Sequence, residues 1–124
     1  MEIAYFFFDA YALYEILSGN PAYEKYDENV SFVTTRLNLM ELYYGLLLKY
    51  GKKVAGEYYD YFLSNVSDLD DETVKEAMEF RLENKRSVLS YVDCVGYALA
   101  RRNGLLFLTG DKAFKGLPGV EYVK

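Results

Sequence analysis

Residues 90–114 read SYVDCVGYALARRNGLLFLTGDKAF. In the first half of this stretch apolar residues recur at the three- and four-residue spacing of a helix. Asn103 and Gly104 follow, and both residue types tolerate the left-handed backbone of a helix end. The run from Leu105 to Leu108 is short, apolar and unbroken, which is typical of a strand buried on both faces of a parallel sheet. The stretch therefore predicts a helix followed by a central strand.

Aspartates stand at both ends of this helix–strand unit. Asp93 falls in the first turn of the predicted helix, and Asp111 comes directly after the predicted strand. At the N-terminus the apolar and aromatic run 3–8 ends in Asp9 and leads into a helix-compatible segment, residues 10–17. Ligands bind at the carboxyl ends of strands in open α/β sheets, so two strands that each deliver an aspartate there predict a functional site.

The rest of the chain alternates between helical and extended patterns. The predicted helices are residues 21–28, 36–50, 52–66 and 70–86, and the predicted strands are residues 30–34, a very short one at 67–69, and an edge strand at 120–123. This order implies an α/β fold, in which a parallel twisted sheet of four to five strands has helices on both faces. At this length we expect a single domain spanning residues 1–124.

The composition narrows the possible chemistry. The chain has no histidine and a single cysteine, Cys94, which excludes Ser-His-Asp and Cys-His catalysis, an internal disulfide and a thiol-based zinc site. The net charge of −5 argues against a protein that coats nucleic acids without sequence preference, because the surface of such a protein is normally basic. No apolar run approaches the length of a membrane span, and no signal-peptide pattern is present. We therefore expect a cytoplasmic protein without membrane association.

Three of the aspartates have a structural explanation beside the functional one. Asp9 and Asp111 could each accept hydrogen bonds from the free amides at the start of the next helix. Ser90 and Asp93 fit the S-x-x-D form of a capping box. For any one of the three alone, capping is the stronger interpretation.

Glu41 is harder to explain as a structural residue. It lies in the apolar helical segment NLMELYYG, where no residue one turn away can form an ion pair with it. A carboxylate in such a segment must reach water or meet a partner from elsewhere in the fold. Gly45, one turn further on, leaves room for a group to approach, so we favour a functional role for Glu41.

Carboxylates that converge at one sheet edge would repel each other. Two unit charges about 4 Å apart cost on the order of 4 kcal/mol at an effective dielectric constant of about 20. A divalent cation removes this cost, and a set of oxygen ligands without His or Cys indicates Mg²⁺ or Mn²⁺, a centre suited to phosphodiester hydrolysis. A phosphatase of the haloacid-dehalogenase type would need an aspartate where Tyr11 stands, and a phospho-receiver domain would need an acceptor aspartate and a lysine that are not suitably placed.

Three segments, FFFDAYAL, TTRLNLMELYYG and YVDCVGYALARRNGLLFLTGD, occur in this order over essentially the whole chain. In this the chain resembles the PIN domain family, and particularly the VapC-like toxins of type II toxin–antitoxin systems. The third segment is the most specific of the three and the first is the least. The resemblance implies an endoribonuclease that hydrolyses RNA phosphodiester bonds with carboxylate-bound metal.

The resemblance also implies roles for particular residues. One or two Mg²⁺ or Mn²⁺ ions would be bound by the four acidic residues Asp9, Glu41, Asp93 and Asp111. Thr109 matches the hydroxyl residue that commonly precedes the last aspartate and orients the site. Asn38 matches a polar residue that often supports the glutamate.

This chain departs from the family pattern at two places. The family usually has a small hydroxyl or polar residue soon after the first aspartate, where this chain has Ala10 and Tyr11. A fifth acidic residue, often found one helical turn after the third, is replaced by Tyr97. These departures bear on turnover and on the geometry of a second metal ion.

The expected partners are an RNA substrate, a VapB-like antitoxin and a second copy of the chain. Fourteen tyrosines and eight phenylalanines are more than the core of a small domain needs, and several of them fall at Tyr58 to Phe62. We expect this face to contribute to a homodimer or to an antitoxin groove. Two alternatives remain open: a PIN-fold binding module that no longer cleaves, and a PIN nuclease of RNA processing without an antitoxin.

Overall fold

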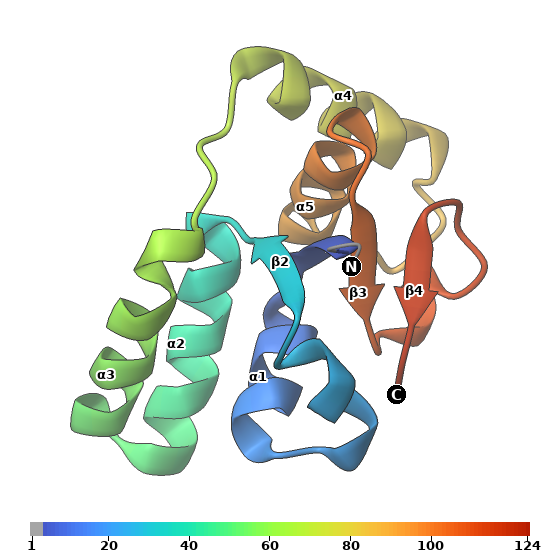
Figure 1. Cartoon of the computed structure of the whole chain (residues 1–124). Coiled ribbons are helices and arrows are strands. Elements are labelled where there is room, and N and C mark those ends of the chain that lie inside the picture. The colour runs from blue at the N-terminus through green and yellow to red at the C-terminus, as the bar shows by residue number, and fades with distance from the viewer. Residues whose placement is uncertain (1–3) are drawn as a thin grey trace.

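The computed structural model describes residues 4–124 and contains a four-stranded, fully parallel sheet of order β2–β1–β3–β4. The strands are β1 (Ala4–Phe8), β2 (Val30–Val33), β3 (Leu106–Thr109) and β4 (Val120–Tyr122). The first strand of the chain therefore lies in the middle of the sheet, between β2 and β3 (Figure 1).

Helices lie on both sides of this sheet (Figure 1). The helices are α1 (Ala10–Ser18), α2 (Arg36–Tyr50), α3 (Lys52–Phe62), α4 (Asp71–Glu83) and α5 (Tyr91–Arg102), with 3-10 turns η1 (Pro21–Tyr26), η2 (Leu63–Asn65) and η3 (Lys112–Phe114). The hydrophobic core on one face is built with α1, α2 and α3, and the core on the other face with α4 and α5.

The aromatic run of β1 supplies both cores, because successive side chains of a strand point to opposite faces. Phe6 and Phe8 join the cluster with α1 to α3, and Phe7 joins the cluster with α4 and α5. The ring of Phe8 stacks on Phe32 at 4.1 Å between centroids, and the ring of Phe7 stacks on Phe107 at 5.3 Å. This two-sided burial explains why the strand is apolar at every position.

A glycine brings α5 close to the centre of the sheet. A Cβ atom on Gly96 would lie 2.8 Å from the ring of Phe7 and 3.4 Å from the ring of Phe107. Both rings are fully buried, so they have little room to move. Only a residue without a side chain lets α5 pack at this distance, and this packing places the first turn of α5, with Asp93, beside the carboxyl ends of β1 and β3.

The predicted fold class is confirmed, and the sheet has four strands. The helix predicted at 36–50 is confirmed to the residue, whereas the strand predicted at 67–69 is wrong: residues 67–69 form no strand, and an isolated bridge to Thr34 is made by Val66, one residue earlier. The helix predicted at 52–66 ends at Phe62 and continues as a 3-10 turn, and the one predicted at 70–86 ends at Glu83. Position 3 of the predicted first strand lies outside the described residues.

The aromatic face expected at 58–62 is only partly exposed. Phe62 is 3% exposed and belongs to the core, while Tyr61 is 70% exposed. Tyr58 and Tyr59 are partly buried against the same cluster. The expectation that Phe62 lies on an open interface is therefore wrong, because the end of α3 packs against β2. In residues 4–124 no helix combines the length and the apolar character that crossing a membrane would require.

Candidate active site

Asp9 is the most buried of the four acidic residues, with 5% of its surface exposed. It is the N-cap of α1, where its Oδ1 accepts a hydrogen bond from the Ala12 amide at 2.9 Å. Its Oδ2 accepts a hydrogen bond from the Thr109 hydroxyl at 2.5 Å. Burial raises the pKa of Asp9 from 3.8 to about 7, and the charges of Asp93 and Asp111 act in the same direction.

Thr109 joins two of the aspartates. Its hydroxyl donates to Asp9 and accepts a hydrogen bond from the Asp111 amide at 3.0 Å. Asp111 in turn caps η3, because its Oδ1 accepts from the Ala113 amide at 3.0 Å. The end of β3 therefore fixes the position of Asp111 relative to Asp9.

Gly110, between these two residues, is enclosed on both sides. A Cβ atom there would lie 2.1 Å from Cε1 of Tyr11 and 2.5 Å from the carbonyl oxygen of Val123. The ring of Tyr11 thus packs directly on the backbone of the turn that carries Asp111. Sequence reasoning treated Tyr11 only as a departure from the family pattern, and missed that it holds this turn.

Asp93 lies in the first turn of α5 and takes part in a capping box. Its Oδ2 accepts from the Ser90 amide at 2.8 Å, and its own amide donates to the Ser90 hydroxyl at 3.1 Å. Burial raises the pKa of Asp93, and the charge of Asp111 adds to this effect. The structural explanation given for Asp93 is thus confirmed, and the same carboxylate lies within the electrostatic reach of Asp9 and Asp111.

Glu41 approaches from α2, on the other side of the sheet. The residue is exposed, yet partial desolvation of its carboxylate raises its pKa, and the charge of Asp93 raises it further. Asn38, one turn earlier, is 2% exposed and hydrogen-bonds with Thr35: its side-chain oxygen accepts from the Thr35 hydroxyl at 2.6 Å. Asn38 therefore stabilises the start of α2. Its side-chain oxygen and its backbone amide both hydrogen-bond with the Thr35 hydroxyl, not with Glu41.

The four acidic residues lie in one electrostatic neighbourhood without a compensating cation. In residues 4–124 the ion pairs are Glu72 with Lys75 and Glu76 with Arg102, so none of the four acids has a basic partner. Within the same range no group of three acidic, cysteine or histidine side chains is disposed as a ready-made metal site. The donors are all oxygens, which fits Mg²⁺ or Mn²⁺ in chemistry.

The position of the fifth acid of the family pattern is part of the core. Tyr97 is 5% exposed, packs against Phe107 and Phe114, and donates a hydrogen bond from its hydroxyl to the Pro118 carbonyl at 2.5 Å. It therefore holds the segment before β4 and has no carboxylate to offer to the site.

One comparison with known proteins identifies a family. A family model described as PIN domain matches residues 6–120. A comparison with curated proteins finds no match.

Three solved structures similar to this chain are toxins or toxin–antitoxin complexes. Mycobacterium tuberculosis VapC20, a toxin that cleaves the sarcin–ricin loop, has a TM-score of 0.81 at 18% identity, over 96% of this chain and 99% of the other. Rickettsia felis VapBC2 bound to a promoter DNA fragment has a TM-score of 0.73 at 21% identity, over 97% and 99%. DNA-bound VapBC from Salmonella typhimurium has a TM-score of 0.73 at 22% identity, over 98% of both chains. At these identities the likeness shows a shared fold.

Proposed function

The chain belongs to the PIN domain family, and from this premise we propose that it is a metal-dependent endoribonuclease of the VapC toxin type, acting as one domain. The observation that carries the proposal is Asp9. It is buried, it accepts two hydrogen bonds as a carboxylate, its pKa is raised to about 7, and no basic side chain among the described residues pairs with it. A bound cation would supply the missing positive charge.

Asp9, Glu41 and Asp93 would be the principal metal ligands, and Asp111 would complete the site directly or through water. A bound Mg²⁺ or Mn²⁺ supplies Lewis acidity, which activates water and neutralises charge on phosphate oxygens. The protein's own contribution is positioning. Thr109 holds the Asp9 carboxylate and the Asp111 backbone together, and the Ser90 capping box holds the first turn of α5.

The partner proposals rest on the similar structures and on one groove. Several of these structures are toxin–antitoxin complexes, which supports a VapB-like antitoxin for this chain. A cavity of about 300 Å³ opens between α1, η1, β2 and α3 and is lined largely by apolar and aromatic side chains, among them Tyr58, Tyr61 and Phe62. We assign this groove to a protein partner, either the antitoxin or a second copy of the chain in a homodimer, and the site to RNA.

A second candidate function is an RNA- or protein-binding module that no longer cleaves. Two observations favour it: no three acidic side chains in residues 4–124 form a ready-made metal site, and Tyr97 replaces the fifth acid. Metal binding without turnover would support this alternative. Cleavage in the absence of any antitoxin gene would favour an RNA-processing nuclease.

Substitution of Glu41 tests the proposal. Glu41→Gln is nearly isosteric and keeps helix propensity, so the fold should persist while Mg²⁺- or Mn²⁺-dependent cleavage of an RNA panel falls by orders of magnitude. Glu57→Gln, an exposed glutamate of α3 away from the site, is the matched control and should cleave like the wild type. Wild-type protein that cleaves no RNA of the panel with either metal would contradict the proposal.

A further inference from the structure

Arg81 has no carboxylate partner among residues 4–124. It lies in the last turn of α4 and is only partly exposed. Its Nε atom is buried without a hydrogen-bond partner, and in residues 4–124 no carboxylate forms an ion pair with it. A partly buried guanidinium without an anionic partner raises the free energy of the folded protein. An anion from another molecule would lower it.

The guanidinium is held on an exposed aromatic ring. Its carbon lies 4.4 Å from the centroid of Tyr91, which is 64% exposed as the first residue of α5. Tyr91 and Asp93 both lie in the first turn of α5, so the Arg81–Tyr91 pair is at the same end of this helix as the proposed site.

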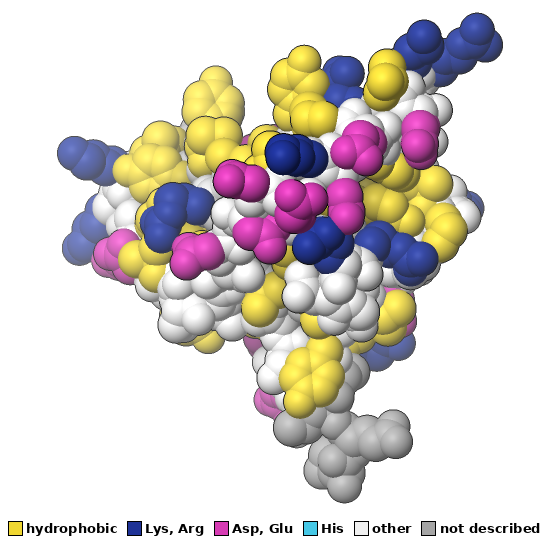
Figure 2. Space-filling model, turned by 90° about the horizontal axis from the view of Figure 1, so that it is seen from above, with side chains coloured by type: hydrophobic (Ala, Val, Ile, Leu, Met, Phe, Trp, Pro, Cys, Tyr) yellow, Lys and Arg dark blue, Asp and Glu magenta, His cyan; other side chains and the backbone are white. Residues whose placement is uncertain are grey.

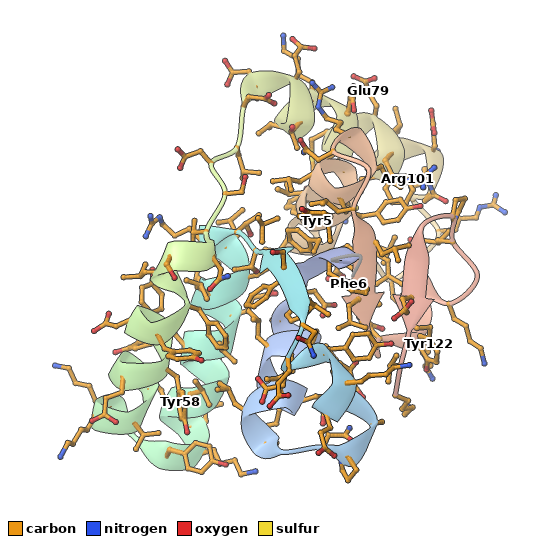
Figure 3. The ribbon with its side chains drawn as sticks, viewed as in Figure 1. Tyr5, Phe6, Tyr58, Glu79, Arg101 and Tyr122 are labelled. Carbon is orange, nitrogen blue, oxygen red and sulfur yellow. The ribbon has the colours of Figure 1, made fainter. Side chains whose placement is uncertain are left out.

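The surface charge changes sign along α4. Seen from above, acidic side chains gather over this helix, and the exposed acids before Arg81 are Asp71, Glu72, Glu76 and Glu79 (Figure 2). Glu79 extends outward from the helix into solvent (Figure 3). By contrast, residues 81–90 carry Arg81, Lys85 and Arg86 against a single acid, Glu83, although the whole chain has a net charge of −5. The end of α4 next to the site is thus the part of this helix that can attract a polyanion.

We propose that Arg81 and Tyr91 form a binding site for a single-stranded segment of RNA next to the bond that is cleaved, an inference that rests on the proposed function. Guanidinium groups bind phosphate oxygens through paired donors, and exposed aromatic rings stack on unpaired bases. Lys85 and Arg86, exposed in the loop that follows α4, add sequence-independent phosphate contacts. The structural alternative is that Arg81 only balances the negative end of the α4 dipole and packs on Tyr91.

Binding measured without cleavage distinguishes these roles. The full chain is titrated in EDTA into a fluorescein-labelled single-stranded RNA, and anisotropy gives the Kd at several salt concentrations. Arg81→Gln should weaken binding about tenfold and reduce the salt slope by about 0.7, the value for one phosphate contact on a single strand. Tyr91→Ala should weaken binding about fivefold or more, whereas Tyr91→Phe, which keeps the ring, should bind like the wild type.

Matched controls separate this surface from general effects of charge and aromaticity. Tyr50→Ala removes an exposed tyrosine from the far end of α2, outside the partner groove, and the double change of Lys52 and Lys53 to serine removes two exposed cations from the start of α3. Both controls should keep wild-type affinity. Circular dichroism checks that each variant is folded.

Several results would overturn the inference. One is wild-type protein that does not bind the RNA. Another is Arg81→Gln and Tyr91→Ala both keeping wild-type Kd, including the case in which they lose affinity for a co-expressed antitoxin instead. Failure of metal-dependent cleavage with RNA binding intact would instead count against the proposed nuclease, so the two failures can be told apart.

Discussion

The buried carboxylate of Asp9 has no basic partner among residues 4–124. Both of its carboxylate oxygens accept hydrogen bonds, from Ala12 and Thr109, and these favour the ionised form. Burial and two neighbouring acids favour the protonated form, and burial is the larger effect. Without metal, this residue therefore binds a proton in the folded state at pH values where the unfolded chain has lost it.

This difference predicts a pH dependence of stability in metal-free protein. The folded pKa is raised from 3.8 to about 7, so the contribution of Asp9 to stability is fully present below about pH 4 and is lost as the pH rises through 7. The loss is at most on the order of 4 kcal/mol. Urea unfolding in EDTA between pH 5 and pH 8 measures it. Asp9→Asn keeps the cap and removes the titration, so equal pH slopes for both proteins would contradict the prediction.

Asp93 allows a separate test of metal binding at the residue scale. Adding Mn²⁺ should raise the Tm of the wild type, through binding linkage and relief of repulsion. Asp93→Asn should weaken this response without lowering metal-free stability, since an amide oxygen can still accept the hydrogen bond from Ser90. Asp70→Asn is the matched control, because Asp70 caps α4 through the Thr73 amide at 2.8 Å.

The outcome for Asp93 separates its two roles. A residue that only caps α5 would leave the Mn²⁺ response intact when changed to asparagine. In that case the Asp93 and Asp70 variants would behave alike in differential scanning fluorimetry.

At the scale of elements, two glycines of helices have opposite environments. Gly96 of α5 faces buried rings, and a Cβ there would approach Phe7 to 2.8 Å, whereas Gly56 of α3 has nothing within 4 Å. Gly96→Ala should destabilise the protein by about 1–3 kcal/mol through overpacking. Gly56→Ala should stabilise it by about 0.5–1 kcal/mol, because glycine is a poor helix former. Denaturant midpoints compare the two, and equal shifts would show that α5 can move away from the sheet.

Local patterns predicted the elements best where both ends of an element carry a signal. Helix α2 was predicted to the residue: Gly51 ends it, and Thr35 caps its start. The strand predicted at 67–69 does not form, because the parallel pairing with Thr34 is limited to a single bridge at Val66. Local sequence does not show whether a short extended segment will pair with the sheet as a strand or only through a single bridge.

The candidate site was predictable only where the residues themselves are chemically unusual. Asp9 and Asp111 follow apolar strands, so the sequence pattern pointed to both of them, whereas Thr109 was suggested only by the resemblance to the PIN domain family. The packing of Tyr11 on Gly110 and of Arg81 on Tyr91 was not predicted. Both contacts join segments that only the complete fold brings together, and neither follows from periodicity or spacing.

At the scale of the whole molecule, we predict a homodimer that uses the groove between α1 and α3. Burying exposed aromatic rings contributes several kcal/mol at about 25 cal/mol per Å² of apolar surface. Tyr61→Ser should therefore lower the mass measured by light scattering, or abolish antitoxin binding, without unfolding the chain. Tyr44→Ser on α2, at 64% exposure against 70% for Tyr61, is the control.

Two results would change this assignment. Dissociation by Tyr44→Ser alone would move the contact to the exposed apolar stripe of α2, which also includes Met40 and Leu48. A Tyr61→Ser protein with wild-type mass and partner affinity would show that the ring is simply exposed. Phe62→Ser should unfold the protein in either case, because Phe62 is core.

The order of strands in the sheet has a consequence for synthesis of the protein. β1 is synthesised well before β3, which pairs with it on one side in the sheet. The hydrogen bond from the Thr109 hydroxyl to Asp9 likewise joins residues 100 positions apart. A nascent or prematurely terminated chain that lacks β3 therefore has Asp9 without Thr109 and Asp111. The proposed metal site therefore cannot assemble before β3 has been synthesised.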